Sequence, residues 1–282
     1  MLLLIGTLPI EGLKLHTGEA TLDNGKLKIG DKRFAVIRGT PAMMAACCAI
    51  CNAYNLDNPY CIVAGDIGAG DGSSSIYNYL KDNLYLLEPE VCAFHYIKPV
   101  LVAHNKVVDA INKMNKKPIL IADAGYMYVA KMAGFASFYD IFTPDLGELA
   151  FLADKESPHP FYTRGFIFHM EDKAEELIEM AYKEKNAPKV LCVKGKKDYI
   201  SKDGKIVKII TKPDIPVLEA IGGTGDTITG MVAAFTYKGL SLENASIISA
   251  KLNRIAGKLT NPTPATQIVD IIERIPLSIE KF

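Results

Sequence analysis

Short apolar runs that end in glycine or a turn residue recur along the 282-residue chain, and a helical pattern follows most of them. Such runs are typical of strands that are buried on both faces of a parallel sheet. Strands that alternate with helices predict a three-layer α/β fold with a mainly parallel central sheet. Ligands of such sheets bind outside the carboxyl ends of the strands. The predicted strands lie at 60–66, 91–96, 118–124, 141–144 and 189–195.

The beginning of the chain departs from this pattern. Asn-Gly and Gly-Asp turn signals separate short strand-like pieces, so we expect residues 1–33 to form a small β element at the sheet edge. Residues 34–41 are predicted to be another buried strand, which ends in a glycine turn before a helix over 42–54. No internal repeat or long linker divides the chain, so residues 1–282 are predicted to form one α/β domain.

Charge and cysteine usage narrow the class of ligand and the compartment. Lys plus Arg equals Asp plus Glu at 32 each, so no basic field favours nucleic acid or an anionic membrane surface. A small-molecule ligand is expected instead, and a homo-oligomer is left open. The opening Met1–Ile5 run is too short for a signal peptide or a membrane span. Six cysteines lie mostly in apolar runs without the spacing of a zinc site, which indicates a reduced, cytoplasmic protein.

A glycine-rich stretch carries the strongest functional signal. Gly222, Gly223, Thr224 and Gly225 lead directly into an apolar helical run, and amides at such a helix start bind anions. The negative carboxylate of Asp226 does not favour a bound anion, so its presence beside an anion site points to a group that takes a proton from the attacking group. This combination predicts phosphoryl transfer with Asp226 as the base. The alternative, an ordinary strand-to-helix turn with a first-turn acid, stays open on spacing alone.

Two further loops offer groups that fit a nucleotide site. Asp145 and Glu148 are suited to hold Mg²⁺ through water, since this ion prefers one or two carboxylates plus substrate phosphates. The same spacing fits a capping box, with Asp145 as N-cap. Lys194, before Gly195, is placed to put an ammonium on a phosphate, although a lysine at a strand end is more often solvated.

Other segments give weaker signals. Residues 66–72 fit neither a calcium loop nor a dinucleotide loop, because glycine occupies ligand positions and the sixth place is Ser73. Residues 154–170 are the least periodic and predict a mobile or specialised loop, whereas 199–210 predict a hairpin. No histidine has a partner at helical ligand spacing, so all five are interpreted as structural or exposed: His16, His95, His104, His159 and His169.

Together these residues resemble the ribokinase-like superfamily, and most closely its NAD(P)H-hydrate dehydratase branch. Residues 222–226 match the branch's GG[ST]GD signature, and 143–148 follow the spacing of TPHPGE. Residues 118–124 are similar to its PVVLDADAL strand, and 190–195 to its VVVLKG strand. Arg38-Gly39-Thr40-Pro41 is similar to its first βα turn. The resemblance extends over about residues 34–260.

The resemblance implies the roles of individual residues. ATP or ADP is expected across the loops at the strand ends, with Mg²⁺ near Glu148 and Asp145 through water. Asp226 is then the base on a substrate hydroxyl. The substrate side is expected to include Gly39, Thr40, Asp123 and Asp145. The phosphate and nucleotide side is expected to include Gly222, Gly223, Thr224, Gly225, Lys194, Gly195 and Asn253.

Phosphorylation of a hydroxyl is common to the dehydratases, which then expel the phosphate, and to the kinases, which release the phosphorylated product. The sequence departs from the dehydratase pattern at Asp145, which replaces the family histidine and resembles the Asn or Asp of the kinases. The DADAL motif becomes Asp123-Ala-Gly125, and Phe94–Pro99 is the nearest counterpart of GPGLG. A hydrate dehydratase-like enzyme is the first interpretation, an ATP-dependent sugar or vitamin-precursor kinase the second, and a non-catalytic nucleotide-binding protein the third.

Overall fold

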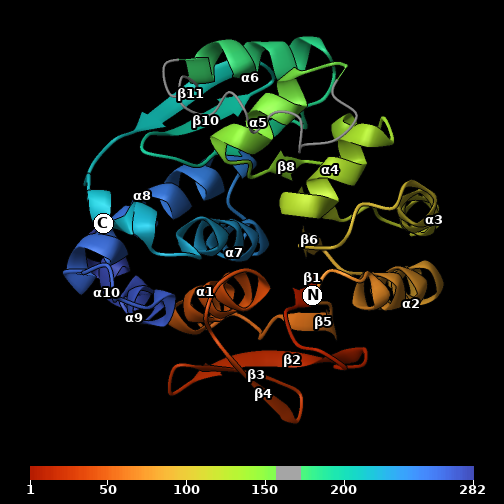
Figure 1. Cartoon of the computed structure of the whole chain (residues 1–282), viewed down its shortest axis with the longest axis horizontal. Helices are drawn as coiled ribbons and strands as arrows, with labels where there is room; N and C mark the ends of the chain where they lie inside the picture. Colours follow the sequence, from red (N-terminus) through yellow and green to blue (C-terminus); the bar gives the residue numbers. More distant parts are fainter. Residues whose placement is uncertain (157–172) are drawn as a thin grey trace.

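The computed structural model describes residues 1–156 and 173–282, which contain an eleven-stranded sheet (Figure 1). The strands follow the spatial order β11-β10-β9-β8-β7-β6-β1-β5-β2-β3-β4. Their bounds are β1 (Leu2–Leu8), β2 (His16–Asp23), β3 (Lys26–Ile29), β4 (Lys32–Ala35), β5 (Tyr60–Gly65), β6 (Val91–His95), β7 (Ile119–Ala122), β8 (Ile141–Phe142), β9 (Val190–Val193), β10 (Asp198–Lys202) and β11 (Lys205–Ile210).

The centre of the sheet is parallel and its two margins are antiparallel. β1 pairs in parallel with β5 and β6, and parallel pairing continues through β7, β8 and β9. β2 pairs antiparallel with β5 and continues into β3 and β4, while the hairpin β10–β11 forms the other margin. The predicted three-layer α/β fold with a mainly parallel sheet is confirmed, as is the hairpin within 199–210.

Two expectations about the first forty residues are wrong. β1 is not part of an edge element, because all seven of its residues are buried and it lies between β5 and β6; only β2–β4 form the edge. The run from Phe34 is not a buried central strand either. It supplies the end of β4, which is a short antiparallel edge strand, and the chain beyond it places Ile37 in solvent with 60% of its surface exposed.

Helices cover both faces of the sheet, and each face has its own hydrophobic core. Figure 1 shows α1, α7, α8, α9 and α10 gathered on one side, with α2, α3 and α4 on the other. No helix of the described residues is both long and apolar enough to cross a membrane. The helices are α1 (Thr40–Ala53), α2 (Asp71–Leu87), α3 (Leu101–Asn112), α4 (Ala124–Met132), α5 (Leu146–Ala153), α6 (Ala174–Lys183), α7 (Thr224–Tyr237), α8 (Leu242–Thr260), α9 (Ile268–Ile272) and α10 (Ile275–Glu280), with 3₁₀ turns at Ala136–Phe138 and Pro216–Ala220.

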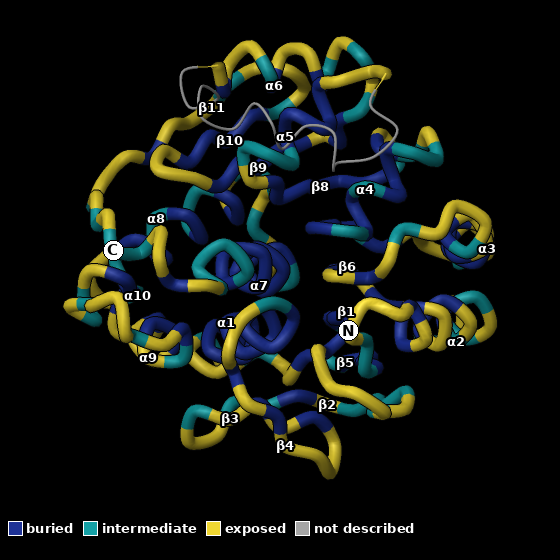
Figure 2. Tube along the Cα trace, in the orientation of Figure 1, coloured by how far each residue is buried: buried dark blue, intermediate teal, exposed yellow. Residues whose placement is uncertain are grey.

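The α1–α7 pair fixes the position of the glycine-rich stretch. Both helices are buried along most of their length (Figure 2). They approach closely at Gly230, where an added Cβ would lie 1.9 Å from the carbonyl oxygen of Met43. Only glycine permits this contact. The hydrogen bond from the amide of Gly39 to Asp226 joins the start of α1 to the start of α7, at the edge where the parallel strands end.

The sequence had not indicated α4, which follows β7 directly at Asp123. Asp123 caps this helix by accepting a hydrogen bond from the amide of Ala124. The segment predicted to be a specialised loop, 154–170, falls outside the described residues from position 157 onward, and so do His159 and His169.

Candidate active site

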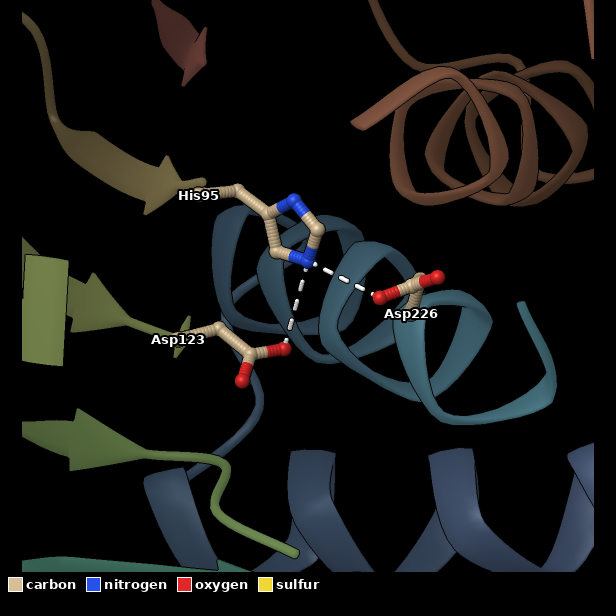
Figure 3. Close-up of side chains that lie close together, drawn as sticks. All are labelled: His95, Asp123 and Asp226. Carbon is tan, nitrogen blue, oxygen red and sulfur yellow. Dashed lines mark hydrogen bonds and ion pairs between the residues drawn. The ribbon is translucent and has the colours of Figure 1, made fainter. Parts of the chain in front are cut away.

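Asp226 lies in the first turn of α7 and both of its carboxylate oxygens accept hydrogen bonds. Oδ2 accepts from the amide of Gly39 at 2.7 Å, and Oδ1 lies 3.0 Å from Nε2 of His95 (Figure 3). The side chain is 13% exposed and borders the cleft described below. Gly39 adopts a φ of 68°, which favours glycine and turns its amide toward α7. The carboxylate is therefore held from two sides.

His95 ends β6 and lies between two acids. Its Nε2 is 3.0 Å from Asp226 Oδ1 and 3.5 Å from Asp123 Oδ2 (Figure 3). Carboxylates only accept, so Nε2 carries a proton. On the other side of the fully buried ring, Nδ1 lies 3.1 Å from the hydroxyl of Thr40. Thr40 and Gly39, predicted to contact substrate, contact His95 and Asp226 in the structure, and Thr40 is buried.

Asp123 joins His95 to a lysine. Its Oδ2 accepts from Nζ of Lys194 at 2.8 Å and from the hydroxyl of Thr229 at 2.6 Å. Lys194 follows β9 and Asp123 follows β7, so two strand ends and α7 meet at this carboxylate. The ammonium of Lys194 is thus buried in an ion pair, which contradicts the alternative of a solvated lysine.

The charges of this network stabilise one another. Burial alone would disfavour the charged imidazole, but hydrogen bonds and charges from Asp123 and Asp226 raise the pKa of His95 to about 9. Burial opposes ionisation of Asp226 as well, but the hydrogen bond and charge of His95 together with the charge of Lys194 outweigh it, so the pKa of Asp226 is lowered. Burial also opposes ionisation of Asp123, but the charges and hydrogen bonds of Lys194 and His95 together outweigh it and lower the pKa of Asp123. At neutral pH the positive charges of His95 and Lys194 therefore balance the negative charges of two carboxylates, Asp123 and Asp226.

A cleft of about 660 Å³ opens beside this network. Gly223, Thr224, Gly225 and Asp226 line it, and the N-cap Gly223 supplies no side-chain acceptor to the first amides of α7. These amides are donors suited to an anion. Gly222 lies beside Arg38 and does not line the cleft.

Two residues of α8 support the cleft wall. Asn253 donates to the carbonyl of Thr224 at 2.9 Å and accepts from the hydroxyl of Thr227 at 2.6 Å, so it holds the glycine-rich turn and also lines the cleft. Arg254 forms a buried ion pair with Asp198 at 2.6 Å. It also donates to the carbonyl of Gly195 at 2.9 Å, which fixes the loop after β9.

Asp145 and Glu148 form the capping box at the start of α5. The Asp145 carboxylate accepts a hydrogen bond from the amide of Glu148 at 2.7 Å, and the Glu148 carboxylate accepts one from the amide of Asp145 at 2.9 Å. The hydroxyl of Tyr128 also donates to Glu148 at 2.9 Å. Both acids line the cleft and also a neighbouring hollow of about 490 Å³. Burial, followed by the charges of Asp145 and Asp123, raises the pKa of Glu148 to about 8. The capping role is present, and the magnesium role stays a prediction.

One group of side chains among the described residues has the type and spacing of metal ligands: His95, Asp123 and Asp226, whose ligand atoms lie within 4.8 Å of one another. The Lys194 ammonium, however, already lies against the oxygen of Asp123 that faces His95. The two cationic side chains supply the positive charge that a metal would bring. This chemistry fits an ion-pair network better than a metal site.

Sequence reasoning missed His95 and Thr229. The sequence did contain a signal for His95, since it follows an apolar run directly and parallel strand ends converge on ligand sites. Tyr96, the next residue, has a φ of 49°, lines both hollows and packs its ring edge-on against His95. Asp66, in contrast, accepts hydrogen bonds from the amides of Gly68, Gly70 and Ser73, so this turn is held by its own acid.

The fold, with a glycine-rich turn and an acid at the carboxyl edge of a parallel sheet, defines a ribokinase-like α/β protein. A family model described as NAD(P)H-hydrate dehydratase, of the carbohydrate kinase type, matches residues 99–277. The chain therefore belongs to this family. The match includes every predicted site residue except Gly39 and Thr40, and it does not include His95.

Two relatives match parts of the chain in sequence. An uncharacterized protein of Methanocaldococcus jannaschii is 43% identical over 78% of this chain and 90% of its own length. A bifunctional NAD(P)H-hydrate repair enzyme of Pyrobaculum aerophilum is 31% identical over 50% of this chain, which corresponds to 26% of that enzyme.

The solved structures share the fold at low identity. An ADP/ATP-dependent NAD(P)H-hydrate dehydratase from Bacillus subtilis, co-crystallised with ATP and Mg²⁺ and soaked with CoA, superposes with a TM-score of 0.60 at 15% identity, over 99% of this chain and 90% of that one. Phosphofructokinase-2 from Escherichia coli gives 0.56 at 12% identity, over 99% of both chains.

Proposed function

We propose that the protein is a nucleotide-dependent NAD(P)H-hydrate dehydratase-like enzyme that transfers a phosphoryl group from ATP or ADP to a substrate hydroxyl. The observation that carries this proposal is the start of α7, where an ionised Asp226 lies one residue from amides without a side-chain cap, at the wall of the cleft. A base next to an anion site is the arrangement that such transfer requires.

Different residues of the cleft have different roles in this reaction. In this proposal the amides of Thr224 and Gly225 hold the transferring phosphate, and Asp226 takes the proton of the attacking hydroxyl; all three residues line the cleft. Asp145 and Glu148 line the same cleft, and their oxygens fit Mg²⁺ through water. Nucleotide and Mg²⁺, when bound, supply the phosphoryl group and neutralise its charge.

Hydrated nicotinamide nucleotide is the first substrate we infer. Family membership supports it, and so does the repair activity named for the Pyrobaculum relative. Nucleotide and Mg²⁺ as cofactors are supported by the Bacillus dehydratase, which was co-crystallised with both. We further propose a cytoplasmic enzyme that forms one domain and acts on small molecules rather than on nucleic acid or membranes.

A small-molecule kinase is the second candidate. Asp145 stands where the dehydratases carry histidine, and it lines both hollows, so the substrate end of the site has an acid of the kinase type. A non-catalytic nucleotide-binding protein is the third candidate, and the ionised, doubly held Asp226 weighs against it.

Turnover assays separate the three candidates. Protein with Mg²⁺ and ATP or ADP is incubated with hydrated NADH, and NADH absorbance is followed; parallel reactions with a panel of alcohols are scored for nucleotide product. We expect absorbance to return only when nucleotide is present, and not with Asp226→Asn. Nucleotide product with an alcohol but no recovery of NADH would favour the kinase. Neither signal, in protein that binds nucleotide, would contradict phosphoryl transfer.

A further inference from the structure

His95 connects the two acids of the site, and it lies outside the stretch that matches the family model. We propose that His95 is a positioning residue for the phosphoryl-transfer step: held as an imidazolium between Asp123 and Asp226, it orients Asp226 and keeps that carboxylate ionised. The catalytic meaning of this assignment rests on the proposed function, whereas the imidazolium itself does not.

Geometry requires a donor at the ring atom that faces the acids. Nε2 is within 3.0 Å of Asp226 Oδ1 and 3.5 Å of Asp123 Oδ2, and neither carboxylate can donate when ionised. The Gly39 amide occupies the other oxygen of Asp226 at 2.7 Å. Rotation of the Asp226 carboxylate would break both bonds, so His95 and Gly39 together fix its plane.

The surroundings of His95 favour its charge. Asp226 faces it from α7 and Asp123 from the end of β7, while Thr40 of α1 lies at Nδ1 and the Tyr96 ring packs against its edge. Lys194 compensates Asp123 from the end of β9. Without a charge on His95 the buried network would carry one uncompensated negative charge, which burial disfavours.

In the transfer step, the substrate oxygen forms a bond to the phosphorus while the bond from that phosphorus to the leaving nucleotide oxygen breaks. The hydroxyl proton passes to Asp226. An already protonated His95 cannot be the acceptor, so its part is to hold Asp226 in the one orientation that can accept. Within the pair, Asp226 alone accepts the proton, and His95 orients it.

The first test observes His95 directly and needs no substrate. Imidazole nitrogen NMR of the wild-type protein should show His95 with both ring nitrogens protonated at pH 7, titrating at about 9. The signal is assigned by its absence in His95→Gln, or, if that variant does not fold, by its shift in Asp226→Asn. We expect the Asp226→Asn change to lower the His95 pKa, because one of the two acids that favour the charge is neutralised. A neutral His95 at pH 7 in the wild-type protein would overturn the inference.

The second test uses the pH profile, which a purely structural role would not move. We expect His95→Gln to lower kcat by about 10²-fold, as a misplaced catalytic group does, with little change in the KM for nucleotide. The acid limb of kcat/KM should move to higher pH, because Asp226 loses the cation that lowers its pKa.

The alkaline limb should disappear with the imidazolium, because His95 no longer titrates. An unchanged profile in folded His95→Gln would refute the assignment while the proposed function stands. Absence of turnover in the wild type would refute the proposed function, while the NMR result would still decide the state of His95.

Discussion

Replacement of Asp226 by Asn tests the site at its centre. Both carboxylate oxygens accept a hydrogen bond, from the Gly39 amide and from His95 Nε2, whereas an asparagine has one acceptor and one donor. One bond must therefore be lost unless His95 gives up its proton. Hydrogen bonds to charged groups contribute about 1.5–3 kcal/mol each, so we expect the free energy of unfolding to fall by about that amount. Turnover should fall by about 10²- to 10⁴-fold because the base is gone.

The stability loss should depend on pH with a definite sign. The pKa of Asp226 is lowered in the folded protein, so its contribution is present above the ordinary carboxyl pKa and is lost as pH falls below it. The pKa of His95 is raised to about 9, so its contribution is full below 6.5 and is lost as pH rises through 9. The wild-type protein should therefore exceed Asp226→Asn in stability most strongly between about pH 4 and 6.5, and the difference should shrink toward pH 9.

Chemical denaturation across pH, with turnover measured on the same samples, checks both expectations. Asp109→Asn, an exposed acid on α3, is the matched control and should change neither quantity. We expect nucleotide affinity to stay nearly unchanged in Asp226→Asn, since the amides of the turn remain. Turnover within about threefold of the parent, or a stability difference that does not vary with pH, would refute the reasoning.

Ligand binding and one buried ion pair give three further predictions. Nucleotide at 100 times its dissociation constant should stabilise the fold by about 2.7 kcal/mol, and an unchanged melting temperature with millimolar ATP or ADP would count against binding. If Glu148 orders Mg²⁺, Glu148→Gln should raise the Mg²⁺ concentration needed for half-maximal rate. The control Tyr128→Phe, which removes only the hydrogen bond that Tyr128 donates to Glu148, should not raise it. If Glu148 only caps α5, neither change should affect the rate. Arg254→Met should destabilise the protein by about 3–5 kcal/mol, because Asp198 stays buried without its cationic partner. The protein should also bind nucleotide more weakly, because Arg254 no longer holds the loop at Gly195. An Arg254→Met variant as stable as the parent in denaturation would contradict this prediction.

Local patterns of the sequence predicted local structure well. The spacing of Asp145 and Glu148 predicts the capping box that begins α5, because both hydrogen bonds of this motif join residues three apart. The glycine-rich stretch before α7 is also a local pattern, because the turn and the helix that it begins are contiguous in the sequence. The hairpin of β10 and β11 follows from the turn residues Asp203 and Gly204.

Arrangements that depend on distant partners could not be derived in this way. The apolar run of β1 gives no sign of whether it pairs at the edge or at the centre, since its neighbours β5 and β6 lie more than fifty residues away. The contact of His95 with Asp226 spans 131 residues, and no periodicity records it. Only the convergence of strand ends brings such pairs together, and this convergence depends on the order of the strands in the sheet.

Gly225→Ala separates the anion site from the stability of the helix that carries it. An added Cβ would meet the Lys194 side chain at 3.5–3.7 Å, which is ordinary contact, and Gly225 lies in the first turn of α7 without a left-handed φ. The change should therefore stabilise the fold by about 0.4–1 kcal/mol, because alanine restricts the unfolded chain. The same methyl group would occupy the space beside Lys194 in the cleft, where we place the phosphates, so nucleotide affinity should fall.

Opposite signs for stability and affinity are the expected result, measured by denaturation and by calorimetric titration with ATP and ADP. Gly223→Ala offers the contrast. Its φ of 104° and a Cβ only 2.9 Å from Ile268 would strain the turn, so both stability and affinity should fall there. If Gly225→Ala binds nucleotide as tightly as the parent, the phosphates do not lie against this turn, and Asp226 would lose its place beside the transferred group.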